Sequence, residues 1–170
     1  MLPLVERHRI GHRRIGVIGT EATIASECYQ RRISDLAPDA VVCAVACPLF
    51  VPLVEQGMLE GEIVDKIIEH YLAPLAGGKI DTLILGCTHY PLLFTALRKF
   101  FGANVHIVEC SRAIADELSR LLDSSGTGRG STSAVTAPQF FVTDAVSRFN
   151  NLTRLCLKDV EVSAEKVSLG

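Results

Sequence analysis

Short apolar runs alternate along the chain with longer segments in which apolar residues recur every three or four positions. The short runs have the length and the branched side chains of buried strands, and the longer segments have the period of amphipathic helices. This alternation favours an α/β fold with a mostly parallel sheet. Strands are expected at residues 15–18, 41–45, 82–85, 105–108 and 140–142.

Helices are expected between these strands, at residues 22–33, 59–72, 92–101, 113–122 and 145–155. Ser111 and Asp144 are placed to cap the last two of these helices, and Gly102 is placed to end the third. Residues 123–138 are rich in Gly and Ser and contain almost no apolar side chains. A flexible loop or linker is therefore expected there.

Composition excludes several classes of protein. The 170 residues include 17 basic and 19 acidic side chains, and the one basic cluster, at residues 7–14, is short. Binding to nucleic acid is therefore not expected, because phosphate contacts need clustered Lys and Arg. No apolar run approaches the roughly 18 to 20 residues of a membrane span, and no signal-peptide core follows the first residue. We expect a cytoplasmic protein with no membrane contact, whose cysteines stay reduced.

A cysteine follows the third expected strand directly. Gly86 ends the apolar run, Cys87 opens the turn into the next helix, and His89 lies two residues further on. Open α/β sheets bind their ligands at the carboxyl ends of the strands, which is where this turn lies. A thiol beside an imidazole is suited to proton transfer or nucleophilic attack. The alternative is a packed cysteine next to a histidine that is hydrogen-bonded to the backbone.

Two threonines lie where the first expected strand ends. Thr20 and Thr23 follow Gly19 at the start of the next helix. Their hydroxyls, together with the free amides of the helix, could hold a carboxylate. Ordinary capping of the helix by Thr20 is the alternative. The two interpretations overlap, because a capped helix presents the same amides.

A proline-rich segment, residues 46–57, follows the second strand and predicts an irregular loop at the same edge of the sheet. Glu55 lies there between apolar neighbours, where it could orient or polarise another group. The alternative is a solvated surface glutamate, which is the commoner environment for this residue type.

The six cysteines raise the question of a metal site. Structural zinc usually shows two tight ligand pairs such as Cys-x2-Cys, whereas Cys43 and Cys47 are separated by three residues and lie partly within a strand. We therefore expect no metal at the candidate ligands, which are Cys43, Cys47, Cys87 and His89. The remaining cysteines are expected to be small apolar fillers: Cys28, Cys110 and Cys156.

Taken in order, the motifs resemble the carboxyl-terminal part of the glutamate racemases, within the cofactor-independent aspartate/glutamate racemase superfamily. The matching runs are GVIGTEAT from residue 16, CPLFVPLVE from residue 47 and LGCTHYP from residue 85, with FVTD from 141 and RF from 148. The resemblance covers about residues 15–160. It implies a lead-in at 1–14, a three-layer α/β lobe with a parallel sheet at 15–110, and at 111–170 a segment that returns to an amino-terminal lobe. The second lobe is then incomplete.

The resemblance also implies roles for individual residues. Cys87 would be one of two cysteine acid/bases that interconvert L- and D-glutamate, His89 would assist it, and Glu55 would act near the Cys87 side. The residues implied to hold the glutamate are Thr20, Thr23 and Thr88. The family makes D-glutamate for bacterial peptidoglycan and uses neither pyridoxal phosphate nor a metal, so no cofactor is expected.

The chain departs from the family in lacking its Asp-Ser-Gly segment and the Cys-Asn-Thr motif with the opposing thiol. One thiol could exchange the α-proton but could not invert the carbon efficiently. Three functions stay open: a glutamate racemase present in part and inactive or weakly active alone, a truncated non-catalytic module that binds a carboxylate or a partner, and a superfamily enzyme acting on another acid. We expect a homodimer or association with a missing amino-terminal lobe, and an unprotected strand at 140–142.

Overall fold

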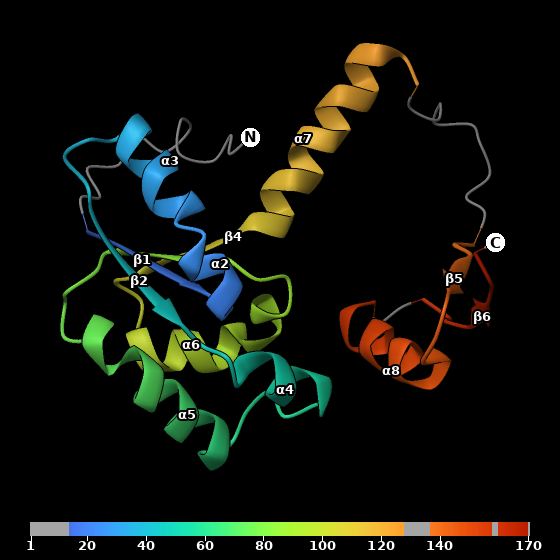
Figure 1. The fold of residues 1–170 in the computed structure, drawn as a ribbon, viewed down its shortest axis with the longest axis horizontal. Coiled ribbons are helices and arrows are strands. Elements are labelled where there is room, and N and C mark those ends of the chain that lie inside the picture. Colours follow the sequence, from blue (N-terminus) through green and yellow to red (C-terminus); the bar gives the residue numbers. More distant parts are fainter. Residues whose placement is uncertain (1–13, 128–136, 158–159, 170) are drawn as a thin grey trace.

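The computed structural model describes residues 14–127, 137–157 and 160–169. A parallel sheet of four strands in the order β2-β1-β3-β4 lies at the centre of the larger part of the molecule (Figure 1). The strands are β1 Arg14–Gly19, β2 Val41–Ala46, β3 Thr82–Leu85 and β4 His106–Glu109. All four were expected from their apolar runs, and the α/β class with a parallel sheet is confirmed.

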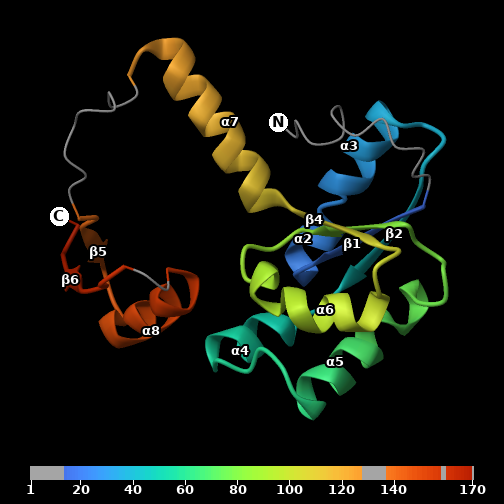
Figure 2. The same cartoon turned by 180° about the vertical axis from the view of Figure 1, so that it is seen from behind.

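Helices cover both faces of this sheet, which makes three layers (Figure 2). Ile18, Leu83 and Leu85 belong to the core on one face, while Val17 and Ile84 belong to the core on the other. Successive strand residues therefore serve opposite faces, as the pleat requires. The helices before β4 are α2 Glu21–Ala25, α3 Cys28–Leu36, α4 Phe50–Glu55, α5 Glu62–Leu72 and α6 Phe94–Phe101, with short 3-10 helices η1 Ala73–Leu75 and η2 Tyr90–Leu93.

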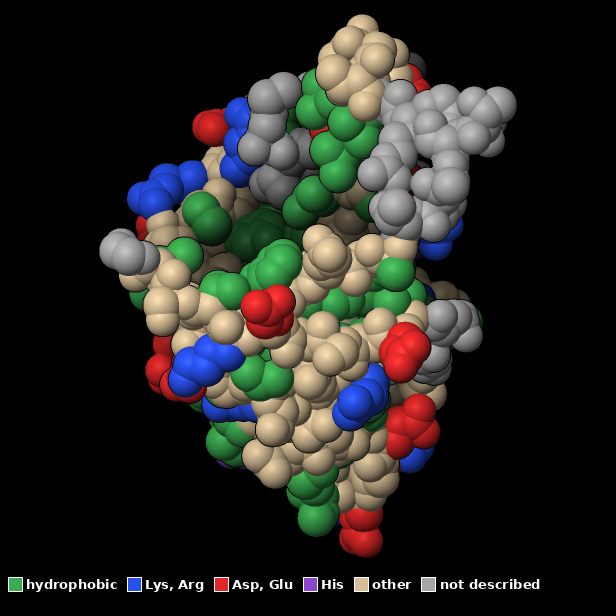
Figure 3. Space-filling model, turned by 90° about the vertical axis from the view of Figure 1, so that its right-hand side faces the viewer, with side chains coloured by type: hydrophobic (Ala, Val, Ile, Leu, Met, Phe, Trp, Pro, Cys, Tyr) green, Lys and Arg blue, Asp and Glu red, His purple; other side chains and the backbone are tan. Residues whose placement is uncertain are grey.

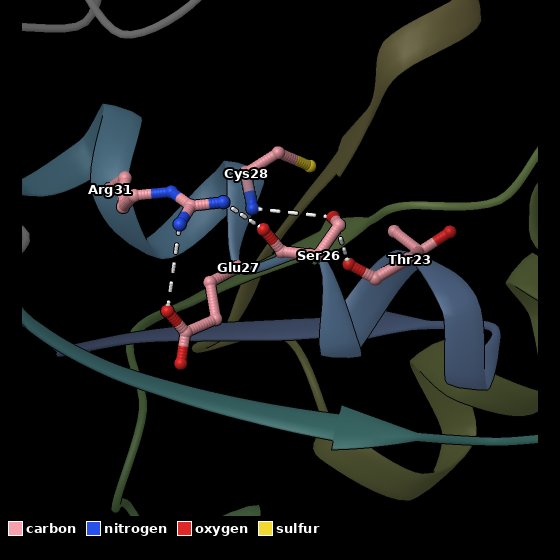
Figure 4. Close-up of polar contacts among 5 residues, drawn as sticks. All are labelled: Thr23, Ser26, Glu27, Cys28 and Arg31. Atoms are coloured by element: carbon pink, nitrogen blue, oxygen red, sulfur yellow. Dashed lines mark hydrogen bonds and ion pairs between the residues drawn. The ribbon is translucent and has the colours of Figure 1, made fainter.

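The expected helix at 22–33 is broken into α2 and α3. Glu27, at the break, has a left-handed backbone with φ of 53°. Polar side chains brace this corner (Figure 4): the Ser26 hydroxyl donates to the carbonyl of Thr23 at 2.7 Å, and the Arg31 guanidinium contacts the Ser26 carbonyl and the Glu27 carboxylate. Apolar spacing continues across the break, so periodicity alone does not reveal it.

The expectation of an irregular loop at 46–57 is wrong, because α4 occupies its second half. Pro52 is the third residue of α4, within the first turn, where backbone N–H groups have no partner inside the helix. The proline therefore removes no hydrogen bond from within the helix and destabilises it little. Phe50, Leu53 and Val54 are buried, and this burial holds the short helix against the sheet.

The last two helices are α7 Cys110–Ser125 and α8 Val146–Cys156. Neither expected cap is present: α7 begins one residue before Ser111, and Ala145 precedes α8 with no side-chain hydrogen bond. The Asp144 carboxylate instead lies 3.5 Å from Lys166 Nζ. Gly102 does end α6, with φ of 73°. The loop expected at 123–138 starts later, after α7, and its residues 128–136 lie outside the described part of the chain.

Two further strands form a separate parallel pair, β5 Phe140–Val142 with β6 Ala164–Lys166. Strand 140–142 was expected to be unprotected, but β6 pairs with one of its edges. The sequence Ala-Glu-Lys of β6 contains no apolar run, so it gave no strand signal. Between these strands runs α8, and its Leu152 packs against the main core. No helix among residues 14–127, 137–157 and 160–169 is long and apolar enough to cross a membrane.

Candidate active site

Two adjacent strand ends carry the predicted residues. Ile18 of β1 lies opposite Leu85 of β3, so the turns after β1 and β3 leave the sheet side by side. The Gly86 amide donates to the Ile18 carbonyl at 2.7 Å. A Cβ at Gly86 would stand 2.9 Å from that oxygen and 3.1 Å from the Tyr29 ring, so only glycine fits without movement. This close approach sets the position of the turn that follows.

Cys87 stands on that turn and is half-buried. Its Sγ lies 3.9 Å from Nδ1 of His89, so the thiol and the imidazole face each other as their spacing suggested. His89 leads directly into η2, whose first residue, Tyr90, is buried. The Tyr90 hydroxyl donates to the Cys47 carbonyl at 2.9 Å and fixes the end of the turn.

The other nitrogen of His89 faces a carboxylate. His89 Nε2 lies 3.7 Å from Oε1 of Glu55, at the end of α4. The Glu55 side chain is only 19% exposed, and its Oε2 pairs with Nη2 of Arg148 on α8. Glu55 is thus not a solvated surface glutamate. The four side chains form one line of contacts, from Cys87 through His89 and Glu55 to Arg148.

Thr20 and Thr23 interact with each other. Thr20 is the N-cap of α2, and its Oγ1 accepts a hydrogen bond from the Thr23 amide at 3.3 Å. The two hydroxyl oxygens are 2.9 Å apart. Capping is therefore present. Both side chains are half-buried at the end of β1, and neither lines the pocket that lies between β3 and α7.

A pocket of about 500 Å³ opens between the end of β3 and α7. Of the predicted residues it includes Cys87 and Thr88, and Thr88 is exposed. Tyr29 and Cys110 line it as well, with Ile114 and Leu118 from α7. Hydrophobic side chains surround a hollow on the face seen in Figure 3. The lining of the pocket is mainly apolar, with Cys87 and Thr88 at the strand end and Cys110 and Ser111 at the start of α7.

The other cysteines differ in environment. Cys47 is buried, and this burial raises the pKa of its thiol to about 12. Cys28 and Cys156 are exposed at helix ends, so the expectation that they fill the core is wrong, and Cys110 is half-buried. Within the described residues, no three His, Cys, Asp or Glu side chains gather as they would around a metal.

The model of the Asp/Glu/Hydantoin racemase family matches residues 4–118 of this chain. This chain belongs to that family. It is 45% identical to the glutamate racemase of Aquifex pyrophilus over 146 residues, which are 86% of this chain and 53% of the relative.

Solved glutamate racemases share the fold. The Francisella tularensis enzyme, in complex with D-glutamate, superposes with a TM-score of 0.82 at 31% identity, over 92% of this chain and 58% of that one. The Thermus thermophilus enzyme, in complex with beta-chloro-D-alanine, superposes with a TM-score of 0.78 at 33% identity, over 94% of this chain and 58% of that one. The resemblance drawn from the motifs is confirmed. The chain spans about half the length of the curated relatives it matches.

Sequence reasoning missed two groups near the racemase motifs. Arg148 was noted only as part of a motif, and its contact with Glu55 spans 93 positions of the chain. Tyr29 packs over Gly86, and its hydroxyl lies 3.5 Å from the Cys110 Sγ. Burial, and secondarily the contact with Cys110, raises the pKa of the Tyr29 hydroxyl. No local pattern signals either contact, because each partner comes from a distant element.

Proposed function

We propose that this chain carries one half-site of a glutamate racemase, in which Cys87 removes and returns the α-proton of glutamate. The observation that carries the proposal is the Cys87 thiol, which faces the His89 imidazole at the mouth of a pocket. The names of the relatives support glutamate as the substrate, and so does the D-glutamate bound to the Francisella tularensis enzyme.

The chemistry requires a base that is ready to act on a weakly acidic carbon. The Cys87 thiol gives its proton to Nδ1 of His89, and the Glu55 carboxylate beside Nε2 stabilises the imidazolium that forms. The thiolate then takes the α-proton and leaves the electron pair on the α-carbon. Thr88, with Thr20, Thr23 and the amides at the start of α2, would hold the substrate carboxylate and limit the build-up of negative charge.

Inversion needs an acid on the opposite face of the carbon. Cys87 can return a proton only to the face from which it took one, so this half-site by itself exchanges the proton and retains configuration. In the proposal, an amino-terminal lobe supplies the second thiol, and the complete enzyme makes D-glutamate for peptidoglycan in the cytoplasm. No cofactor takes part.

Exchange of the α-hydrogen in D2O tests the half-site directly. L-Glutamate is incubated with the full chain, loss of the α-proton signal is followed by NMR, and D-glutamate is measured by chiral chromatography. We expect slow exchange with little or no D-glutamate. The Cys87→Ser variant should abolish exchange, whereas Cys43→Ser, which removes an exposed thiol from β2, should retain it. Exchange that survives in Cys87→Ser would contradict the proposal.

A non-catalytic module is the second candidate, and the exposed apolar surface of α7 favours it. An apolar face of α7 remains exposed, and a second copy or an amino-terminal lobe would cover it; its residues are Ile114, Leu118, Leu121 and Leu122. This candidate predicts glutamate binding by calorimetry with no exchange of the α-proton, and equal binding to Cys87→Ser.

A further inference from the structure

Arg148 reaches the racemase motifs from a distant part of the chain. It lies in the first turn of α8, and its Nη2 contacts Oε2 of Glu55 on α4. The Arg148 side chain is 62% exposed, whereas that of Glu55 is 19% exposed. The guanidinium therefore covers the carboxylate from the solvent side and leaves the other oxygen, Oε1, facing His89.

The same face of α8 contacts the main core through Leu152. Leu152 lies four residues after Arg148, which puts both side chains on one side of the helix. Leu152 packs against the main core, next to which α4 is buried through Phe50, Leu53 and Val54. The contact between Arg148 and Glu55 therefore joins the buried helix α4 to α8, which touches the core through the half-buried Leu152.

The orientation of Glu55 decides which nitrogen of His89 carries the proton. A carboxylate beside Nε2 favours the tautomer with its proton on Nε2, and the lone pair is then on Nδ1. Nδ1 is the atom that faces Cys87 Sγ, at 3.9 Å. A lone pair there can accept the thiol proton, whereas an N–H at the same position cannot.

We propose that Arg148 is a positioning residue that holds Glu55 on His89, and so keeps the Nδ1 lone pair facing the Cys87 thiol. An arginine suits this role because its guanidinium stays charged and can hold the rotamer of the carboxylate through a directional hydrogen bond. The inference rests on the proposed function for the role of Cys87, but the state of His89 can be measured whether or not the chain exchanges protons.

Nitrogen-15 NMR of the imidazole rings, at about pH 7.5 where histidine and cysteine are both ordinarily neutral, reports the tautomer of His89. Its signals are assigned by their loss in His89→Gln. In the wild-type chain we expect the proton mainly on Nε2. Arg148→Gln should shift the population toward the Nδ1–H form and slow alkylation of Cys87 by iodoacetamide by about fivefold. Arg148→Lys, which retains a charge without the planar fork, should restore part of the wild-type tautomer population and part of the wild-type alkylation rate.

Two comparisons separate positioning from a structural effect. Arg154→Gln removes a guanidinium from the same helix, where it contacts only Asn151 among the hydrogen bonds of the described residues, and should change neither readout. In a Glu55→Gln background, Arg148→Gln should have no further effect on either readout, because the carboxylate that Arg148 positions is gone. An unchanged His89 tautomer in Arg148→Gln, or an equal effect in both backgrounds, would overturn the inference. Absence of α-proton exchange with the tautomer shift intact would count against the proposed function alone.

Discussion

The Tyr90 hydroxyl donates a hydrogen bond of 2.9 Å to the carbonyl of Cys47, 43 positions earlier in the chain. Both residues are buried, and the bond ties the turn after β3 to the start of the segment that carries α4 and Glu55. The contact links two of the family motifs, since Cys47 opens one and Tyr90 lies in the other. It accounts for a tyrosine, rather than a phenylalanine, at this position.

Tyr90→Phe tests that contact. The ring would still fill its place, and the Cys47 carbonyl would keep its hydrogen bond from the Phe50 amide but lose the one from the tyrosine, so we expect a loss of about 0.5–1.5 kcal/mol in the free energy of unfolding. Urea denaturation followed by circular dichroism measures this loss. Tyr71→Phe is the matched control, because the Tyr71 ring also packs edge-on against Phe50 but is only half-buried. A loss as large in the control would show that the hydroxyl contact is not the cause.

Gly86→Ala should destabilise the chain more than Gly16→Ala. At Gly86 the new Cβ would meet a backbone oxygen at 2.9 Å, which cannot move without shifting β1. At Gly16 the nearest atom, also at 2.9 Å, is the end of the flexible Ile80 side chain, which can rotate. We expect about 1–3 kcal/mol for Gly86→Ala and less for Gly16→Ala in urea denaturation. Equal losses would indicate that β1 adjusts freely beside the turn.

The buried Cys47 thiol predicts a decrease in stability at alkaline pH. Its pKa is raised by burial from 9.0 to about 12 in the folded chain. Between these values the unfolded thiol loses its proton while the folded one keeps it, so stability is complete below about pH 9 and falls as the pH rises toward 12. Urea denaturation at several pH values should show a shallower decline in Cys47→Ala than in Cys43→Ala. Identical slopes would exclude Cys47 as a source of the decline.

The exposed apolar face of α7 predicts association of the isolated chain. Leu118 is 53% exposed and Ile114 is 65% exposed on the same side of the helix. Apolar surface gathered in this way promotes contact between molecules. We expect Leu118→Glu to lower the apparent mass in sedimentation experiments and to change the unfolding free energy by no more than about 0.5 kcal/mol. Glu117→Gln, on a neighbouring side of α7, should leave the apparent mass unchanged.

Where a signal is local, the fold followed from the sequence. Each of the first five strands is an apolar run of a few residues, and the burial of alternate residues on opposite faces follows from the pleat. The elements that were missed have no such run. α4 contains a proline and is stabilised by tertiary burial, β6 is Ala-Glu-Lys, and the break at Glu27 depends on one left-handed residue.

The sequence by itself determined the strand ends and the local pair of Cys87 with His89, because two residues on one turn are neighbours in any fold that forms the turn. Only the tertiary structure decided which groups face the other nitrogen of His89. Glu55 and Arg148 are 93 positions apart in the chain, and they meet because α4 is buried in the main core and α8 contacts that core through Leu152. Such a meeting is set by packing between distant segments, which no short stretch of sequence contains.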